Sequence, residues 1–576
     1  MPAVEWLKGA AKQPYWERPS RNYLVRRWPD LFATCVAILF FWTSLTPSLV
    51  PRPWLLQGVI GGITAAIGYA VGSVFAALFR AVVRRHAGAR ARARCWQVFW
   101  VLSLVGSVLL LWHSAHMQRQ LRALQGLAPT SAWWHSPLIG IVAVALWLLI
   151  LAAARSVRLG SSKLIHWLDR HLPRPVAIGL GLLLTTMIVV TGLRDVVFDR
   201  GVIDVADRIA KATNFGTTEG ITKPTSRSVS GGPDSLISWK DLGLQGRNFT
   251  GSVLSSEKIS AFTGRAAKDP VRVYISSSAP EAFSEHEPFK AQAQLAVREL
   301  KRTGAFDRKV LAIAGTTGSG WIDSGIVESL EYMYGGDTAM VAVQYSYLPS
   351  WVSFLVDKEK AGQTTRALVE AVQAEVHKLP ADRRPKLVVT GESLGGYAIE
   401  ASYGSVDRLL GNTDAALLIG VPNFSPVARE LRERRDEGSP MWRPQFEDGR
   451  NIRFAQFPEK DLKRPPATWG QPRAVYLQNA SDAVVWWSPD LLFQRPQWLD
   501  KPLGPDISPD IDWFPFVGFW QTTVDMAVSY GVDAPHGHRY GAGPVDGWAA
   551  VLAPPGWTEK DTRQLRKHIE GRKAPY

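Results

Sequence analysis

A serine stands between two glycines in the sequence Gly391-Glu-Ser-Leu-Gly395. The apolar run 386–390 before it predicts a buried strand, and a helix is expected to begin directly after the serine. In that setting the Gly-x-Ser-x-Gly sequence is typical of a nucleophilic serine, because the turn is too sharp for side chains two residues either side. Ser393 is therefore the predicted nucleophile, with Gly391 and Gly395 as the glycines that permit the turn. The alternative is an ordinary strand–helix loop.

A serine needs a base to take its proton, and histidine is the usual one. Five histidines follow residue 194: His286, His377, His536, His538 and His568. Three of them fall in polar loops or charged helix faces, which leaves the loop 533–540. We expect His538 to be the base because it follows a glycine, as in many enzymes of this type, and His536 is the alternative. Two histidines without a third nearby ligand do not predict a metal site.

The acid that orients the histidine should follow a late strand and precede the base. The apolar run 473–479 predicts such a strand, and Asp482 comes three residues after it. We expect its carboxylate to fix the tautomer of the imidazole and to stabilise the imidazolium. A helix cap is the alternative role for this residue. Asp490 and Asp533 are rival candidates.

Two backbone N–H groups are needed to hold the oxyanion of an acyl-transfer reaction. The N–H of Leu394 is one expected donor, because it follows the nucleophile directly. The glycine-rich loop 312–321 is expected to supply the other, from Thr316 or Thr317. A phosphate-binding loop is the competing interpretation, and the lack of a following lysine weakens it. No cofactor is expected.

The elements that must position these residues alternate between strand and helix from residue 238 onward. Apolar strands separated by amphipathic helices predict a mostly parallel sheet with helices on both faces. The expected strands are 271–276, 309–315, 338–345, 386–390, 414–420 and 473–479, and clear helices are 289–303 and 360–378.

Residues from about 240 to 570 resemble the α/β-hydrolase fold in their Gly-Thr-Thr-Gly, Gly-Glu-Ser-Leu-Gly-Gly and His-Gly-His-Arg-Tyr motifs. Together with the apolar runs that precede them, they resemble a family of actinobacterial multi-pass membrane-anchored α/β-hydrolases. The resemblance implies a serine hydrolase and leaves the substrate open.

Apolar runs without charged residues fill the N-terminal third, and each is long enough to cross a bilayer. They are 31–50, 55–79, 95–112, 137–154 and 176–193. We therefore expect an all-α bundle of five transmembrane helices in contact with a lipid bilayer. The predicted organisation is a cytoplasmic segment 1–30, a transmembrane domain 31–193, a helix and linker 194–237, and an α/β-hydrolase domain 238–576.

The net charge of +15 belongs to that N-terminal third. Residues 1–193 contain 20 Lys and Arg against 4 Asp and Glu, whereas the rest of the chain contains 46 against 47. The basic residues lie between apolar runs and not on a folded face, so no nucleic-acid partner is expected. Their number in successive connections is 6, 1, 6, 2 and 5. The positive-inside rule then places the N-terminus in the cytoplasm and everything after residue 193 on the extracytoplasmic side of the cell membrane.

Two further features carry alternatives. Gly68 and Gly72 lie one helical turn apart, which suits either packing within the bundle or the contact face of a homo-oligomer, and we favour the former. An aromatic-rich insertion separates Asp482 from His538, with Trp486, Trp487, Phe493, Trp498, Trp513, Phe514, Phe516, Phe519 and Trp520. It suits either a small separate core, which we favour, or an apolar channel for an acyl chain.

These observations predict a membrane-anchored extracytoplasmic serine hydrolase of esterase or lipase type. Its expected substrate is a lipid, glycolipid or other envelope acyl ester, an inference from location. An acyltransferase that uses the same residues on envelope acceptors is one alternative. A peptidase is another, and a non-catalytic envelope scaffold is the alternative from a different class.

Overall fold

The computed structural model describes residues 29–82, 88–129, 134–277, 279–280, 284 and 286–576. Most of the expected cytoplasmic segment 1–30 lies outside these residues. The chain divides into two compact units. The helical unit contains the chain up to Gly201 together with Pro489–Leu499 and Ile507–Val528, and the sheet unit contains the remainder.

Long apolar helices make up most of the helical unit. The part of the chain that the structure describes contains four that are long and apolar enough to cross a membrane. They are α3 (Trp54–Val82), α4 (Ala89–Leu124), α5 (His135–Leu168) and α6 (Arg174–Thr191), the last running through a π-helical stretch (Gly192–Ile203) into α7 (Asp204–Asn214).

The first expected span differs from the prediction of five full helices. Helix α2 (Leu31–Thr43) has only 13 residues, fewer than the ~20 that a membrane-spanning helix needs. The helix ends because Pro47, Pro51 and Pro53 interrupt the remaining apolar stretch, which continues as irregular backbone. The backbone groups of this stretch find partners inside the protein: Gln57 and Gln125 donate to the carbonyls of Ser44 and Leu49 at 2.9 and 2.8 Å.

The small residues of α3 serve packing within this unit. A Cβ on Gly68 would lie 2.8 Å from Phe40, and one on Gly72 would lie 2.7 Å from Ala33, both on α2. On the other side, a Cβ on Gly58 would lie 2.7 Å from Val142 of α5. Glycine therefore lets α3 approach two neighbouring helices of the same chain closely.

Most of the aromatic insertion also belongs to the helical unit. Its helix α19 (Val517–Val528) places Asp525 fully buried, where it accepts a hydrogen bond from the backbone N–H of Leu49 at 2.9 Å and faces Arg52. The amide of Gln521 on the same helix donates to the carbonyls of Ser44 and Thr46. The helix thus replaces solvent around the connection between α2 and α3. The aromatic rings contact one another, as in the pairs Phe493–Phe516 and Phe519–Trp520.

The sheet unit is built around seven parallel strands in the order β1-β3-β2-β4-β5-β7-β6. They are β1 (Val271–Ile275), β2 (Val310–Gly315), β3 (Thr338–Val343), β4 (Lys386–Glu392), β5 (Ala415–Ile419), β6 (Ile452–Ala455) and β7 (Arg473–Leu477). Nearly every strand residue is buried, which explains why the strands read as continuous apolar runs.

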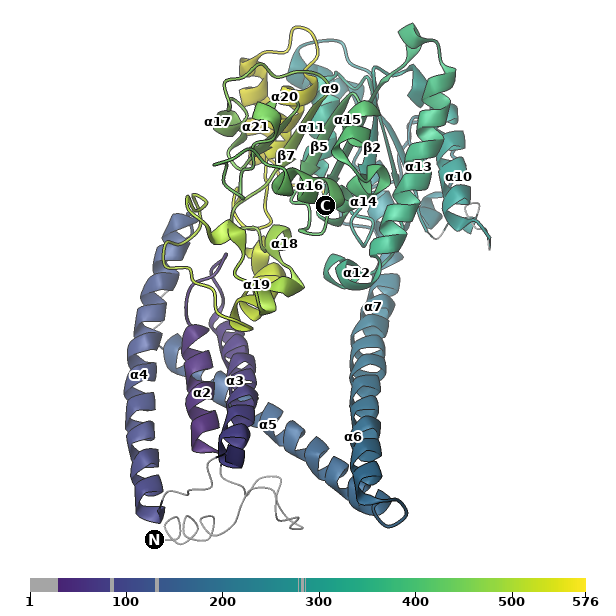
Figure 1. The fold of residues 1–576 in the computed structure, drawn as a ribbon. Helices are drawn as coiled ribbons and strands as arrows, with labels where there is room; N and C mark the ends of the chain where they lie inside the picture. The colour runs from purple at the N-terminus through teal and green to yellow at the C-terminus, as the bar shows by residue number, and fades with distance from the viewer. Residues whose placement is uncertain (1–28, 83–87, 130–133, 278, 281–283, 285) are drawn as a thin grey trace. The chain divides into compact units, whose positions relative to one another are not determined.

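Helices cover both faces of this sheet (Figure 1). One face carries α10 (Pro288–Arg302), α13 (Lys358–Lys378), α14 (Leu394–Tyr403) and α16 (Pro426–Glu433). The other carries α9 (Ser256–Thr263), α11 (Ser324–Met333), α20 (Gly543–Leu552) and α21 (Glu559–Gly571). Shorter helices are α8 (Gly243–Gly251), α12 (Ser350–Val356), α15 (Val406–Gly411), α17 (Pro458–Asp461) and α18 (Ala483–Trp486). The predicted α/β architecture with a parallel sheet is confirmed.

The edge strand β6 was not predicted from the sequence. It has four residues and contains Arg453, which breaks the apolar pattern. The guanidinium is buried and donates to the carbonyls of Leu462 and Ala467 at 2.7 and 2.8 Å, so its charge is satisfied by loop backbone.

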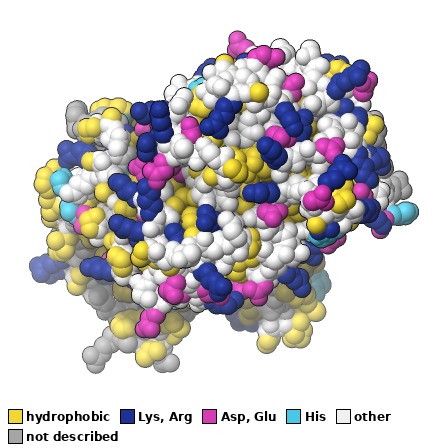
Figure 2. Space-filling view, turned by 90° about the horizontal axis from the view of Figure 1, so that it is seen from above, with side chains coloured by type: hydrophobic (Ala, Val, Ile, Leu, Met, Phe, Trp, Pro, Cys, Tyr) yellow, Lys and Arg dark blue, Asp and Glu magenta, His cyan; other side chains and the backbone are white. Residues whose placement is uncertain are grey.

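On the outer surface, Figure 2 shows basic, acidic and apolar side chains interspersed over the face of the sheet unit turned toward the viewer.

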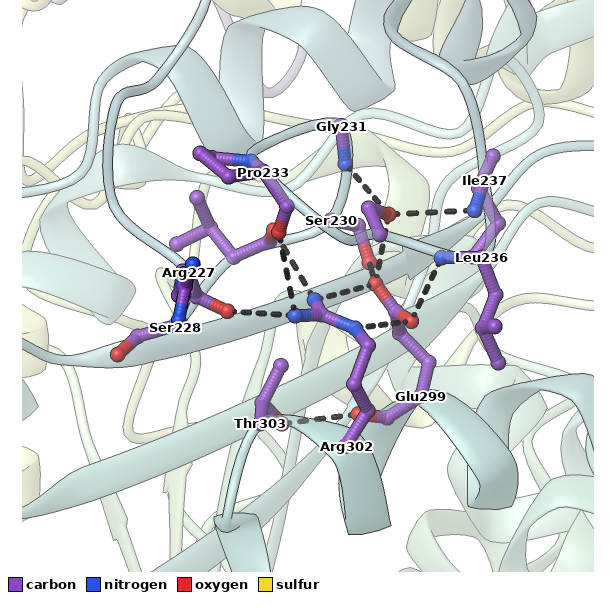
Figure 3. A network of polar contacts seen from close by, with 12 residues as sticks. Arg227, Ser228, Ser230, Gly231, Pro233, Leu236, Ile237, Glu299, Arg302 and Thr303 are labelled. Carbon is purple, nitrogen blue, oxygen red and sulfur yellow. Dashed lines mark hydrogen bonds and ion pairs between the residues drawn. The ribbon is translucent and has the colours of Figure 1, made fainter.

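The second half of the expected linker is fixed to the sheet unit. Glu299 of α10 is fully buried and accepts hydrogen bonds from the hydroxyl of Ser235 at 2.7 Å and the N–H of Leu236 at 3.1 Å (Figure 3). Arg302, one turn later, pairs with Glu299 and donates to the carbonyl of Arg227 at 2.8 Å. A glycine- and serine-rich composition therefore marks, in this stretch, a loop that wraps the domain.

Candidate active site

Ser393 lies in the turn between β4 and α14. Its backbone has φ 56° and ψ −126°, a conformation that costs a non-glycine residue ~1–3 kcal/mol. The N–H of Ser393 donates to the carbonyl of Ile419 at 2.8 Å, which holds the turn against the end of β5. Such strain is maintained only where the surrounding structure fixes the backbone, and it places the hydroxyl at the carboxyl edge of the sheet.

The flanking glycines are required by close backbone contacts. A Cβ on Gly391 would lie 2.4 Å from the carbonyl carbon of Gly395, and a Cβ on Gly395 would lie 2.2 Å from the carbonyl oxygen of Gly315. Gly315 ends β2 and pairs with Gly391 across the sheet. The turn and the end of β2 therefore meet backbone to backbone.

The structure brings Asp482 and His538 together from two loops that are far apart in the sequence. Nδ1 of His538 lies 2.6 Å from Oδ2 of Asp482, and both side chains are buried. Nε2 of His538 is buried and has no hydrogen-bond partner among the residues that the structure describes. The imidazole thus has one nitrogen held by a carboxylate and the other available to exchange a proton.

Two further groups hold the Asp482 carboxylate. The hydroxyl of Tyr540 donates to Oδ2 at 2.6 Å, and the N–H of Val484 donates to Oδ1 at 2.9 Å. Asp482 therefore also caps the short helix α18, so the helix-cap role and the histidine contact occur in the same residue. Burial and the neighbouring carboxylate raise the pKa of Tyr540 well above its usual value, so this phenol stays a hydrogen-bond donor.

The alternative base and the rival acids have other surroundings. Nδ1 of His536 lies 2.9 Å from Oδ2 of Asp506, away from Asp482. Asp490 and Asp533 are exposed, and the backbone carbonyl of Asp533 accepts the N–H of His536. Of the candidates weighed from the sequence, the pair that meets in a buried contact is therefore Asp482 with His538.

The glycine-rich loop after β2 contains both candidate oxyanion donors. The N–H of Thr317 already donates to the carbonyl of Trp321 at 3.1 Å, which closes the loop on itself. The side-chain hydroxyl of Thr316 donates to the carbonyl of Val343 at 3.1 Å and fixes this residue beside β3. A Cβ on Gly395 would lie 3.3 Å from the carbonyl carbon of Thr316, so this loop borders the turn that carries Ser393.

Several residues that support this arrangement were not found from the sequence. Nδ2 of Asn479 donates to the carbonyls of Gly537 and Arg539 at 2.9 Å each, and so holds the histidine loop. Gly420 ends β5 with φ 53°, and a Cβ there would lie 2.7 Å from Cε1 of His538 and 2.8 Å from Tyr540. These roles depend on contacts between distant segments, and the only local signal was the position of Asn479 at a strand end.

Comparison with known proteins agrees with this geometry. Residues 271–565 match the Alpha/beta-hydrolase family, and residues 45–253 match the N-terminus of an Alpha/beta-hydrolase family. The chain belongs to the alpha/beta-hydrolase family. No curated protein and no solved structure matches this hydrolase.

Family membership supports a hydrolase type of activity, and the two matches cover both the apolar helices and the sheet. What the hydrolase could do chemically follows from its side chains. A hydroxyl in a strained turn, an imidazole and a carboxylate at one sheet edge suit nucleophilic acyl transfer. Among the described residues, no group of three or more His, Cys, Asp or Glu side chains is placed to hold a metal ion.

Proposed function

We propose that this hydrolase is a membrane-anchored serine esterase that works through an acyl-enzyme intermediate. The observation that carries the proposal is the buried contact between Asp482 and His538, which leaves Nε2 of the imidazole without a partner at the edge where the strained turn presents Ser393. A structural histidine would be expected to use both nitrogens when buried.

In the proposed reaction, the hydroxyl oxygen of Ser393 attacks the carbonyl carbon of an ester while its proton passes to Nε2 of His538. The resulting oxyanion is held by the backbone N–H groups of Leu394 and Thr316, and Asp482 stabilises the imidazolium. The tetrahedral intermediate collapses, and the imidazolium gives its proton to the departing alcohol. Water then attacks the acyl-enzyme by the same route and releases the acid. Transfer to an alcohol acceptor would follow the same steps with the acceptor in place of water.

We propose an extracytoplasmic location for the sheet unit, as the charge alternation suggests. Two contacts within the helical unit support it. Asp30 at the start of α2 pairs with Arg80 near the end of α3, and Ser44 just after α2 accepts from Gln57 near the start of α3. The segment 30–44 thus runs alongside α3 as a crossing segment would.

The insertion supplies the second part of that argument. Helix α19 follows the four membrane-capable helices of the described chain, yet its residues Gln521 and Asp525 bind the connection between α2 and α3. That connection and the sheet unit would then lie on one side of the membrane, opposite the basic N-terminal segment. An envelope lipid or other acyl ester on that side is the proposed substrate class, on the basis of location.

Labelling with a membrane-impermeant fluorophosphonate in intact cells tests the nucleophile and its side of the membrane together. We expect the wild-type chain to be labelled and Ser393→Ala to show no labelling. Ser402→Ala is the matched control, because this serine lies on α14 with its hydroxyl bonded to the carbonyl of Ala398. Equal labelling of Ser393→Ala, or no labelling of folded wild type even in detergent, would refute the proposal.

A further inference from the structure

Two carboxyl groups lie beside the turn that carries the predicted nucleophile, and one of them is buried. Glu392 is the last residue of β4 and precedes Ser393, and it is 5% exposed. Asp323 precedes α11 and accepts a hydrogen bond from the N–H of Gly325 at 2.5 Å. The two carboxyls line one small cavity together with Thr317 of the glycine-rich loop, and they are close enough to form a hydrogen bond if one of them is protonated.

Two carboxylates in contact inside a protein cannot both be ionised at low cost, so such a pair holds one proton between them. Burial, followed by the charge of Asp323, raises the pKa of Glu392 well above its usual value. Burial also raises the pKa of Asp323, against the hydrogen bond from Gly325. The N–H of Gly325 favours the ionised form of Asp323, so Glu392 is the partner expected to carry the proton.

The charged and titratable groups around the pair favour this state. Those whose charge acts on Glu392 or Asp323 are Asp482, Arg539, Tyr530, Arg572, Glu328 and Tyr576. Only two of them are cations, and Arg572 already pairs with Glu328 at 3.0 Å. A second negative charge at Glu392 would add to that of Asp482 beside the place where the oxyanion forms.

We propose that Glu392 and Asp323 share one proton, and that this neutral hydrogen-bonded link is a positioning device for the nucleophile. The link ties the end of β4, which leads into Ser393, to the end of the loop that contains Thr316. It thereby fixes the distance between the attacking oxygen and the proposed oxyanion donors. The inference rests on the proposed function of Ser393, although the shared proton itself does not.

The proton has a predictable effect on stability. The folded-state pKa of Glu392 is raised, so the folded protein binds a proton that the unfolded chain releases above its ordinary pKa of ~4.3. The free energy of unfolding therefore falls as pH rises from that value toward the folded-state pKa. Glu392→Gln keeps a donor for Asp323 and removes this proton, so the loss of stability with pH should become smaller.

The test compares the full-length wild type with Glu392→Gln and Glu392→Ala in detergent, measuring the rate of fluorophosphonate labelling from pH 5 to 10. In wild type, we expect the rate to fall on the alkaline side by about tenfold per pH unit once the shared proton is lost. Glu392→Gln should lack that alkaline decline. Glu392→Ala should label more slowly at every pH because the link to the loop is absent.

Glu400→Gln is the matched control, since Glu400 is a buried acid on α14 that accepts the N–H groups of Val427 and Ala428. It should keep the wild-type alkaline decline. The same decline in Glu392→Gln, together with an unchanged pH dependence of the melting temperature, would overturn the shared proton. If Glu392→Gln does not fold, Asp323→Asn removes the other charge of the pair and is judged by the same two measurements. Absence of labelling at any pH would instead refute the function of Ser393, and the melting data would still judge the pair.

Discussion

Asp482 combines two tasks that are usually considered separately. One carboxylate oxygen caps α18, and the other accepts from both His538 and Tyr540. A carboxylate with three hydrogen-bond partners is held in one orientation. The imidazole opposite it is thereby restricted to the tautomer with a proton on Nδ1, which leaves Nε2 as the acceptor for a serine proton.

Replacement of Tyr540 by phenylalanine tests this arrangement at the level of one hydroxyl. Tyr540→Phe removes one donor to Asp482 and retains the ring, so we expect labelling of Ser393 to slow by about tenfold, equivalent to ~1.4 kcal/mol. Tyr530→Phe is the control, because its ring packs edge-on against His538 at 5.0 Å between centroids without bonding to the carboxylate. Fluorophosphonate labelling rates of the two variants provide the measurement. Similar rates for both would show that the Tyr540 hydroxyl does not matter.

For single residues, the sequence predicted the candidate site residues that directly follow apolar strands. It did not predict the residues that support the site through contacts between distant segments. Ser393 and Asp482 could be found because each comes just after a strand that can be predicted from its run of apolar residues. Tyr540 and Gly420 could not, because their roles exist only where the histidine loop meets the end of β5. The catalytic roles of Ser393, Asp482 and His538 stay predictions, whereas the contact of the last two is a feature of the structure.

Helix α19 contacts a part of the chain that the sequence did not lead us to expect, the connection between α2 and α3. Its buried Asp525 accepts the N–H of Leu49 and faces the buried guanidinium of Arg52, whose terminal nitrogen donates to the carbonyl of Thr46 at 2.7 Å. Burial raises the pKa of Asp525 to about 6, so the carboxylate is ionised at neutral pH. The contact therefore depends on charge as well as on shape.

Removal of this carboxylate should destabilise the helical unit. Asp525→Ala leaves Arg52 buried without its counter-charge, which typically costs ~3–5 kcal/mol. We expect a lower melting temperature in detergent, measured on the full-length protein, whereas Asp510→Ala at an exposed position of the same insertion should melt as the wild type does. A melting temperature that does not change in Asp525→Ala would mean that the buried pair contributes nothing to folding.

The sequence predicted elements well where hydrophobicity alone decides them. The long helices and six strands are uniformly apolar, so their positions follow from burial. It failed for α2 and β6, where prolines and a buried arginine interrupt the pattern and distant side chains supply the missing hydrogen bonds. We expected the insertion to form a small core of its own. Its contacts with the connection between α2 and α3 could not be predicted, because nothing in the local sequence pattern indicates them.

At the scale of the whole molecule, the proposed topology gives a direct experiment. In a chain whose Cys35 and Cys95 are replaced by serine, a single cysteine is placed at Lys567 of α21 or at Gly88 before α4, both exposed positions. A membrane-impermeant maleimide should label Lys567→Cys in intact cells and should label Gly88→Cys only after permeabilisation. The reverse pattern would place the sheet unit in the cytoplasm and would contradict the proposed location.

The path of the chain between the acid and the base has a practical consequence. The chain leaves the sheet unit after Ser488, returns for Asp500–Asp506, leaves again, and returns at Ser529. A fragment that begins after residue 237 would therefore carry α19 without the backbone that Gln521 and Asp525 bind, and would expose the buried carboxylate of Asp525 to water. A truncation that keeps only the chain after residue 237 is therefore expected to destabilise α19, because the hydrogen-bond partners of Gln521 and Asp525 lie before that residue.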